Sequence, residues 1–206
     1  MIRAFFICIL LGFCITAIAQ YDWKLQRDKD SIKVYTSDNP SSSFKTVRVE
    51  ATLSGNYYKL ISFLSNVEGF KEWIYNTRFS KLLRKNSDYD FIYYSETHMP
   101  WPVSNRDAII QLQIRTDSLP RFLIITGKNI NGILPELPPR VRIANYSATW
   151  KVTMPSSDHI HISYVVEVDP SGSLPAWVAN MYADKGPWGS FVNLRELLLG
   201  NIGNKF

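Results

Sequence analysis

The sequence predicts a single α+β domain, in which a curved antiparallel β-sheet wraps around a long C-terminal α-helix and leaves an internal hydrophobic cavity. Most of the chain alternates apolar and polar residues, which is typical of strands with one dry and one wet face. Helical spacing appears only in two short stretches after the second strand and over residues 173–199. The apolar face of a sheet must be covered, and only the C-terminal helix is long enough to cover it. A curved sheet around a helix leaves a cleft in which a small ligand can bind.

The N-terminal residues have the layout of a secretory signal peptide. Arg3 supplies a positive start, and residues 4–15 form an apolar run that is too short to span a bilayer. Ala17 and Ala19 then occupy the −3 and −1 positions of a cleavage site. We therefore expect that residues 1–19 are removed and that the protein is exported, to the periplasm or the extracellular space.

Residues 20–206 then form a single mature domain. An alternative lipoprotein signal around Cys14 is disfavoured, because the bulky Phe13 precedes the cysteine. Cys8 and Cys14 both lie in the expected signal peptide, so the mature domain relies on its apolar core and not on disulfide bonds. Its 187 residues suffice for such a core, since a chain of this size buries about 70% of its unfolded surface.

The charge balance of the mature domain is mildly basic. Without Arg3 it has 22 basic and 18 acidic side chains, a net charge of +4. The basic residues are scattered, which indicates a solvated surface; attraction to anionic lipid headgroups is a second use, worth about 1 kcal/mol per well-placed cation. The chain has no zinc-ligand pattern and no nucleic-acid-binding motif, so we expect no nucleic-acid partner. We expect a monomer that contacts membrane surfaces transiently.

The first part of the mature domain combines two strands with two short helices. Residues 31–36 and 44–53 alternate apolar and polar side chains, and the intervening residues 38–43 are rich in turn-forming types. Asn56 opens a helix whose apolar side chains share one face, namely Tyr57, Leu60, Ile61 and Leu64. A second short helix is predicted over residues 67–73.

Residues 79–169 read as a run of antiparallel strands, and the chain after them returns to helical spacing. Four segments of the run put their apolar set on one face: residues 91–99, 106–114, 142–152 and 160–168. The predicted C-terminal helix covers residues 173–199. Pro187 is expected to kink or split it near residues 185–186, and Gly200 ends it.

Two motifs resemble those of a known family. Residues 100–107, PWPVSNRD, resemble the Pro-x-Pro-x-Ser-x-Arg-Asp signature of StAR-related lipid-transfer (START) domains. Residues 169–177, DPSGSLPAW, with Asn180 and residues 185–187, resemble the approach to the C-terminal helix in that family, and residues 23–25 fit its opening. The resemblance implies the helix-grip fold of the Bet v 1-like superfamily. It also implies a tunnel that binds a sterol, a phospholipid, a sphingolipid or another hydrophobic molecule.

Arg106 is the most informative single residue. It alternates in phase with the inward-facing Ala108 and Ile110, so its side chain is expected to point into the domain. A buried guanidinium needs an anion. Two partners remain open: a protein carboxylate that only maintains the cavity, or the headgroup of an anionic ligand, as the resemblance implies. The sequence does not identify the acid, since Glu96 and Asp90 both have the opposite strand orientation.

Aromatic and flexible apolar side chains are expected in the space between the sheet and the helix. For each of them alone, ordinary core packing is the default interpretation, because a sequence does not distinguish a filled core from a hollow one. The resemblance favours a cavity. We therefore predict that the ligand-binding residues are Arg106, Tyr93, Met99, Ala108, Ile110, Tyr146, Trp150, Trp177 and Met181.

The sequence argues against a catalytic or metal site. His159 and His161 have a spacing that can bind a metal, but they alternate with the apolar set and are expected to face solvent, without a third ligand nearby. His98 is expected at the rim of the cavity. The chain has no nucleophile elbow and no glycine-rich phosphate loop. We therefore expect no metal, no cofactor and no enzymatic activity.

Residues 132–139 form a proline-stiffened loop with two open interpretations. Its apolar side chains either pack down onto the domain or form a lid that touches a membrane. The function predicted from the sequence is binding, and possible transfer, of one lipid or other hydrophobic molecule. The alternatives are a helix-grip enzyme of the cyclase or hydrolase type, which a polar dyad in the cavity would favour, and an interaction module with a filled core.

Overall fold

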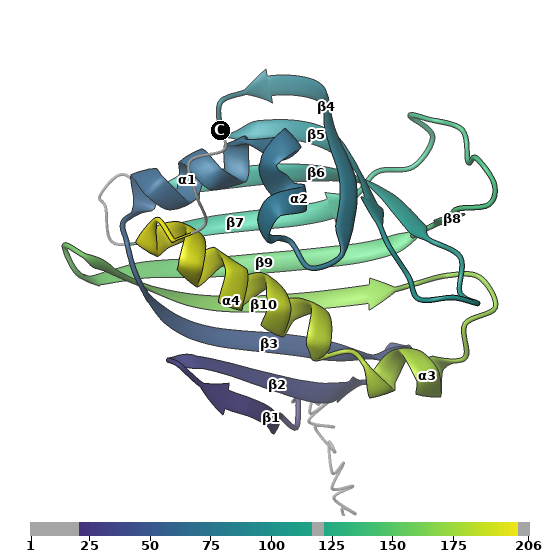
Figure 1. Cartoon of the computed structure of the whole chain (residues 1–206), viewed down its shortest axis with the longest axis horizontal. Coiled ribbons are helices and arrows are strands. Elements are labelled where there is room, and N and C mark those ends of the chain that lie inside the picture. Colours follow the sequence, from purple (N-terminus) through teal and green to yellow (C-terminus); the bar gives the residue numbers. More distant parts are fainter. Residues whose placement is uncertain (1–20, 117–121, 202–206) are drawn as a thin grey trace, which may run out of the picture.

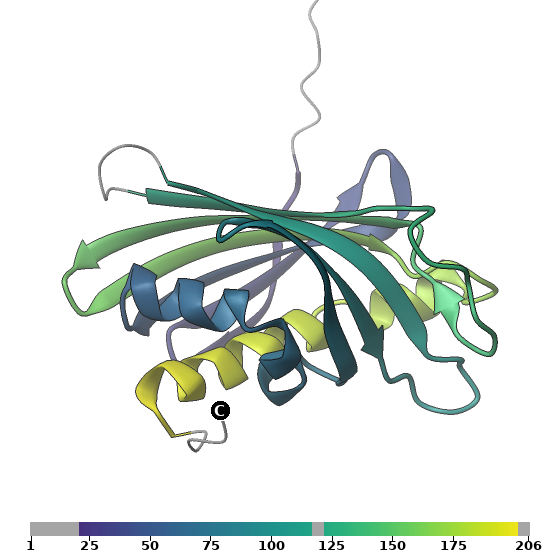
Figure 2. The same cartoon turned by 90° about the horizontal axis from the view of Figure 1, so that it is seen from above.

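The computed structural model describes residues 21–116 and 122–201, so the expected signal peptide lies outside the described residues (Figure 1). In this part of the chain ten strands form one sheet, in the order β1-β2-β3-β10-β9-β7-β6-β5-β4, with β8 beside β6. The sheet is strongly curved, and the helices α1, α2 and α4 lie against one face of it (Figures 1 and 2). This is the α+β architecture predicted from the sequence.

The elements follow one another in chain order with short connections. The first group is β1 (Lys24–Lys29), β2 (Ile32–Asn39), β3 (Ser42–Ser54), α1 (Tyr57–Ser65), the 3-10 helix η1 (Val67–Gly69) and α2 (Phe70–Trp73). The antiparallel run is β4 (Thr77–Ser87), β5 (Asp90–Thr97), β6 (Arg106–Thr116), β7 (Phe122–Asn129), β8 (Val141–Arg142), β9 (Asn145–Ser156) and β10 (His159–Asp169). The chain ends with α3 (Ala176–Met181) and α4 (Lys185–Leu199).

The central strands confirm the predicted orientation of their side chains. β9 pairs with β10 so that Val152 lies opposite Ile162. Both side chains are completely buried, whereas the intervening Lys151 is exposed. Because successive side chains point to opposite faces, this register puts the whole apolar set of both strands on the helix side of the sheet. The same alternation places Arg106 on that side at the start of β6.

Helix α4 covers the apolar face and is tied to the segment that follows α2. Gly189 permits the close approach, because a Cβ atom there would lie 2.4 Å from Cδ2 of Tyr75. The backbone N–H of Tyr75 donates to the hydroxyl of Ser190 at 3.0 Å. The side-chain amide of Asn193 donates to the carbonyl of Trp73 at 3.1 Å. Packing and polar contacts together therefore fix the C-terminal helix over the sheet.

One predicted strand is interrupted. Residues 142–152 were expected to form a single strand, but β8 pairs in parallel with the start of β6 and the chain leaves the sheet before β9 begins at Asn145. A segment that pairs with two different strands must turn between them. The alternation of side chains does not reveal such a turn, because residues 143–144 keep the apolar pattern.

The predicted C-terminal helix is two helices. α3 ends at Met181 and α4 begins at Lys185, so the break lies slightly before the expected position. Pro187 occupies the first turn of α4, where its missing N–H leaves no helical hydrogen bond unmade. Gly200 ends α4 in the left-handed conformation with φ 80°, as expected. Across residues 21–116 and 122–201, no helix has the length and hydrophobicity required to cross a membrane.

Candidate functional site

A cavity of about 460 Å³ lies between the sheet and the helices α2, α3 and α4. Its size falls within the range of about 300–1,000 Å³ that is usual for ligand pockets. Side chains of β3, β5, β6, β9 and β10 form the wall on the sheet side. Seven of the predicted ligand-binding residues line it, namely Tyr93, Met99, Arg106, Ala108, Ile110, Tyr146 and Trp150. Their contact with a ligand stays a prediction.

Trp177 and Met181 do not line the cavity, which corrects their predicted position. The side chains of Trp177 and Met181 are exposed, by 68% and 57%. The prediction assumed one continuous helix, but α3 is a separate short helix whose axis follows its own course. The helix turns a different face to the cavity, with Val178, Ala179 and Asn180, and the chain just after it adds Tyr182 and Ala183.

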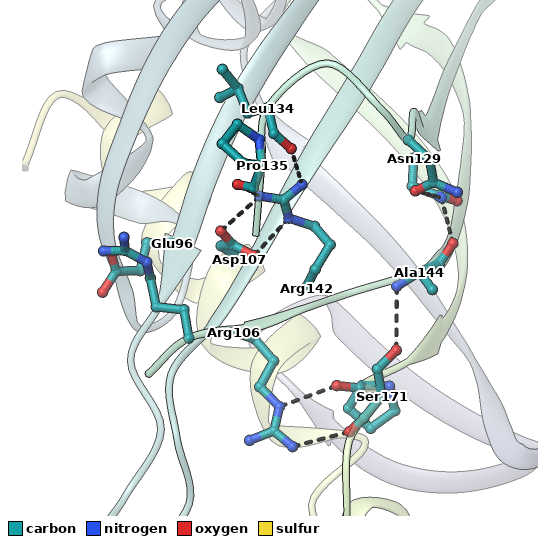
Figure 3. Close-up of polar contacts among 12 residues, drawn as sticks. Glu96, Arg106, Asp107, Asn129, Leu134, Pro135, Arg142, Ala144 and Ser171 are labelled. Atoms are coloured by element: carbon teal, nitrogen blue, oxygen red, sulfur yellow. Dashed lines mark hydrogen bonds and ion pairs between the residues drawn. The ribbon is translucent and has the colours of Figure 1, made fainter. Parts of the chain in front are cut away.

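Arg106 is buried at the cavity wall, with only 4% of its surface exposed. Its guanidinium donates to three main-chain carbonyls: Nε to Pro170 at 3.1 Å, Nη1 to Ser104 at 2.6 Å and Nη2 to Ser171 at 3.2 Å. Figure 3 shows the guanidinium reaching the chain at Ser171. These bonds hold the loop before β6 against the segment after β10, both of which border the cavity.

Of the two partners left open for Arg106, a protein carboxylate is not found among the described residues. In residues 21–116 and 122–201, no carboxylate lies within 4.0 Å of its guanidinium. Glu96 instead pairs with Arg140 at 3.2 Å and accepts a bond from the amide of Asn105 at 3.0 Å. Asp90 accepts bonds from Gln111 and other amides at the far end of β5.

The charge of Arg106 is therefore stabilised by the dipoles of main-chain carbonyls. No anion among the described residues neutralises it. Burial lowers the pKa of Arg106 from its usual value, although an arginine remains protonated in proteins. Three of the five N–H groups of its guanidinium donate to the carbonyls described above. The arrangement leaves donors and an uncompensated positive charge at the wall of a largely apolar cavity, where they favour an anionic group.

A buried ion pair that sequence reasoning missed lies next to Arg106 but faces the other side of the sheet. Nε and Nη2 of Arg142 donate to the two carboxylate oxygens of Asp107 at 2.7 and 3.1 Å (Figure 3). Arg142 also donates to the carbonyls of Leu134 and Pro135, so it fixes β8 and the loop of residues 132–139. Burial and the adjacent Asp107 carboxylate raise the pKa of Tyr94 to about 12. The pair depends on the parallel contact of β8 with β6, for which the sequence has no signal.

Tyr164 is a further lining residue that was not named as a ligand-binding residue. It follows Ile162 on the inward face of β10, so its position was available from the strand alternation. Its ring lies 4.7 Å from that of Trp150 and 5.5 Å from that of Phe191, centroid to centroid. Trp150 and Phe191 in turn stack at 5.2 Å, which joins the sheet wall to α4.

The cavity reaches the surface between the loop of residues 98–105 and α3. Three residues of its wall are exposed there, namely Tyr75, Pro100 and Tyr182. Beside them stand two large aromatic side chains that point outward: Trp101 in the loop, 92% exposed, and Trp177 on α3. The loop and α3 lie at the same end of the molecule in both views (Figures 1 and 2). We call this opening, framed by residues 98–105 and α3, the mouth.

The loop of residues 132–139 is not part of the cavity wall. Its apolar side chains Ile133, Leu134 and Leu137 are 37%, 38% and 54% exposed, so the domain covers them only in part. They do not line the cavity, and contact of this loop with a membrane stays a prediction. The segment that borders the cavity is the START-like motif region, with Met99, Pro100 and Val103 in the wall.

A side-chain amide anchors α3 to the edge of β3. The pairing of β3 with β10 ends where Val47 meets Val166, which leaves the preceding backbone groups of β3 without a strand partner. Asn180 satisfies two of them: its Oδ1 accepts from the N–H of Lys45, and its Nδ2 donates to the carbonyl of Ser43, each at 2.9 Å. Asn180 thus replaces a neighbouring strand at the side of the mouth.

His159 and His161 lie away from the cavity, whereas His98 belongs to the loop at the mouth. Nε2 of His161 lies 3.3 Å from the carboxylate of Glu50, and Nδ1 of His159 lies 3.0 Å from that of Asp158, both on the opposite face of the sheet. Within the described ranges, no group of three or more His, Cys, Asp or Glu side chains could hold a metal ion. His98 is exposed beside the motif loop.

The sequence profile of the START domain matches residues 17–187. The chain belongs to the START domain family. Its curved antiparallel sheet with C-terminal helices is the helix-grip fold of that family, as the motifs of residues 100–107 and 169–177 indicated. Proteins of the START family generally bind or transfer lipids, and this general function is the one that the comparisons support.

Relatives cover nearly the whole chain. An uncharacterized protein of Pseudomonas aeruginosa is 29% identical over 188 residues, which are 91% of each chain. The phosphatidylcholine transfer protein of Mus musculus is 23% identical, over 82% of this chain and 80% of its own. The crystal structure of a STAR-related lipid transfer protein from Xanthomonas axonopodis has a TM-score of 0.79 and 27% identity, and covers 86% of this chain and 98% of that fragment. Human STARD10 has a TM-score of 0.75 at 19% identity, over 86% and 73%, which shows the fold alone.

Proposed function

We propose that the protein carries one lipid with an anionic phosphate group in its cavity and exchanges that lipid with membranes. The observation that carries this proposal is Arg106, a buried cation at the wall of an apolar cavity whose described partners are carbonyls. A phosphate would supply the missing negative charge and accept charge-assisted hydrogen bonds from the remaining N–H groups. The apolar wall would bury the hydrocarbon chains. We propose a carrier and not an enzyme, because transport of the intact lipid needs only these two features.

Exchange requires that one side of the cavity opens. The sheet is held by ladder hydrogen bonds, each with a net value of about 1 kcal/mol, so parting its strands is unfavourable. α3 has no buried residue, and it is fixed at its edge by the two hydrogen bonds of Asn180. We therefore assign the moving side of the mouth to α3 together with residues 98–105.

The surroundings of the mouth suit a membrane surface. Trp101 and Trp177 expose large aromatic rings, and Met181 and Tyr182 add apolar surface on α3. Aromatic side chains favour the interface between lipid headgroups and hydrocarbon. Docking there would solvate these side chains in lipid and allow a lipid to pass without crossing water.

The compartment is a separate part of the proposal. The expected cleavage of residues 1–19 would release the carrier outside the cytoplasm, where it would act between membranes or between a membrane and an extracellular partner. Mass spectrometry of the protein from fractionated cells of its native host tests this directly. A mature species that begins at Gln20 in the exported fraction supports it, and a full-length cytoplasmic species contradicts it.

The function is tested by identifying the bound molecule and then by measuring its transfer. Native mass spectrometry of protein purified from its native host, followed by extraction, is expected to yield an intact phosphate-containing lipid. Transfer of fluorescent phosphatidylglycerol from donor to acceptor vesicles is then compared for wild type, Arg106→Gln and Arg106→Lys. We expect Arg106→Gln to fold and to lose most transfer, and Arg106→Lys to retain part of it, because it keeps the charge without the planar fork.

The matched control is Arg140→Gln, which removes an equal charge that pairs with Glu96 outside the cavity wall. It is expected to transfer lipid as the wild type does. Equal transfer by Arg106→Gln and Arg140→Gln, with both variants folded, would show that Arg106 only joins the two loops. Recovery of a chemically altered product from the native protein would support the enzyme alternative.

A further inference from the structure

The cavity contains a second polar site that the proposed phosphate contact does not use. Three tyrosines line it from three different strands: Tyr93 on β5, Tyr146 on β9 and Tyr164 on β10. Tyrosine hydroxyls in an otherwise apolar wall normally have a hydrogen-bond partner. Among the described residues, the hydroxyl of Tyr93 has no protein partner.

A glycine makes room for the ring of one of these tyrosines. Gly127 lies on β7, between the strand of Tyr146 and that of Ile110. A Cβ atom at Gly127 would lie 3.2 Å from Cε1 of Tyr146 and 3.6 Å from Cγ2 of Ile110. The edge of the Tyr146 ring therefore packs against β7, in the space that the glycine leaves open. Ile110, which lies next to the same space, pairs with Tyr93 in the next ladder.

The three hydroxyls are neutral donors in the cavity wall. Burial raises the pKa of Tyr164 well above its usual value, and the nearby Tyr146 adds to the shift. Burial also raises the pKa of Tyr93, with a smaller contribution from Tyr146. All three therefore stay protonated at any physiological pH. Within residues 21–116 and 122–201 none of the three hydroxyls makes a hydrogen bond of ordinary length to a protein group, so their O–H groups remain for a ligand.

The ring faces of these tyrosines are already in use. Tyr164 packs against Trp150 and Phe191, with ring centroids 4.7 and 5.5 Å apart. Tyr93 meets the ring of Phe70 edge to face at 5.1 Å. Tyr146 lies on the backbone at Gly127. What remains for the ligand is the hydroxyl ends, which favour a neutral oxygen acceptor over a cation that would need an open ring face.

We propose that the hydroxyls of Tyr93, Tyr146 and Tyr164 form a specificity site that donates hydrogen bonds to the ester carbonyl oxygens of an acyl lipid. This inference rests on the proposed function. It adds that the protein distinguishes lipids by the linkage of their chains in addition to the headgroup phosphate. The site lies about four residues along β5 from Thr97, the partner of Arg106, so the two polar sites are separate along the cavity wall.

The test compares two probes that differ only in these oxygens. Dioleoyl phosphatidylglycerol has two ester carbonyls, and its dialkyl ether analogue has the same headgroup and chain length without them. Each competes with a fluorescent phosphatidylglycerol for the wild-type protein. One hydrogen bond of average net strength corresponds to a preference of about fivefold for the ester lipid. We expect this preference to disappear in the triple variant Tyr93→Phe/Tyr146→Phe/Tyr164→Phe, which removes three oxygen atoms and little volume.

The matched control is Tyr57→Phe, a buried tyrosine outside the cavity wall whose hydroxyl donates to the carbonyl of Val152 at 3.3 Å. Tyr57→Phe is expected to keep the ester preference of the wild type, even if its thermal stability is lower. A wild-type protein that binds both lipids equally would overturn the hydroxyl site while leaving the carrier function in place. An ester preference that survives in the triple variant would also overturn it. Failure of the wild type to bind either lipid would overturn the carrier function together with this inference.

Discussion

The side-chain amide of Asn180 is expected to control how often the mouth opens. Its Nδ2 donates to the carbonyl of Ser43 and its Oδ1 accepts from the N–H of Lys45, each at 2.9 Å. The substitution Asn180→Asp preserves the size and the acceptor for Lys45 but removes the donor for Ser43. It also places a carboxylate oxygen against the Ser43 carbonyl oxygen, so one side of the contact becomes repulsive.

The magnitude follows from the single lost hydrogen bond. Its net contribution is about 1 kcal/mol, and leaving the Ser43 carbonyl unpaired beside a charge raises the loss to about 2 kcal/mol. The population in which α3 is detached from β3 is then expected to rise by about 5- to 30-fold. The free energy of global unfolding changes less, because α3 has no buried residue and detaches as a local unit.

Two measurements check this expectation. Hydrogen exchange of the α3 amides is expected to accelerate in Asn180→Asp, and release of a preloaded fluorescent phospholipid is expected to accelerate by the same factor. The matched control is Asn193→Asp on α4, which changes the charge equally. It removes an equivalent amide donor, which bonds to the carbonyl of Trp73 on α2. Asn193 does not line the cavity, so its variant is expected to release lipid at the wild-type rate.

Two results would refute the reasoning, and they refute different parts of it. Unchanged exchange of the α3 amides would mean that the Asn180 amide does not hold the helix. Faster exchange of these amides with an unchanged rate of lipid release would mean that α3 detaches without opening the passage. In that case the moving side of the mouth would be residues 98–105 alone.

Three further predictions concern stability. Asp107→Ala leaves the buried guanidinium of Arg142 unpaired and is expected to lower the free energy of unfolding by about 3–5 kcal/mol in chemical denaturation, whereas a loss below 1 kcal/mol would show that the pair is solvated. Gly189→Ala puts a methyl group 2.4 Å from Cδ2 of Tyr75 and is expected to lose about 1–3 kcal/mol in the same assay; an unchanged midpoint would contradict the close approach. The hydrogen bond from Gln111 lowers the pKa of Asp90, so its contribution is complete above the unfolded-state pKa of about 3.9 and disappears as the pH falls through the lower folded-state pKa. The stability difference between wild type and Asp90→Ala is therefore expected to shrink with acidification, and a difference independent of pH between 6 and 2 would exclude this role.

The sheet was predictable because its signal is local. The alternation of β9 and β10 fixes which side chains face inward, and their pairing then follows from neighbouring hairpins. The turn between β8 and β9 was not predictable, since it depends on a parallel contact with β6 that is distant in sequence. The same contact creates the pair of Asp107 and Arg142. A buried ion pair formed through such a contact has no spacing that a sequence can display.

The site was predictable in part for the same reason. Strand alternation placed Arg106 and Tyr146 at the cavity wall, and the motif of residues 100–107 drew attention to the correct arginine. The acceptors of Arg106 were not predictable, because they are main-chain carbonyls and a carbonyl belongs to every residue type. Trp177 was misplaced because helical spacing was extended through the break between α3 and α4. Gly127, in contrast, was a readable signal, since a glycine inside a strand often marks a close approach.

The hollow itself constrains which residues can line it. An empty apolar cavity of about 460 Å³ would cost on the order of 10 kcal/mol at about 24 cal/mol per Å³, which is comparable to the whole stability of a typical domain. Polar groups reduce this cost, because water can occupy a cavity that offers it hydrogen bonds. Arg106 and the hydroxyls of Tyr93, Tyr146 and Tyr164 provide such bonds at two separate places on the wall. The groups that we assign to the phosphate and to the ester carbonyls would therefore also stabilise the water-filled protein after the lipid has left, which a carrier needs and a filled core does not.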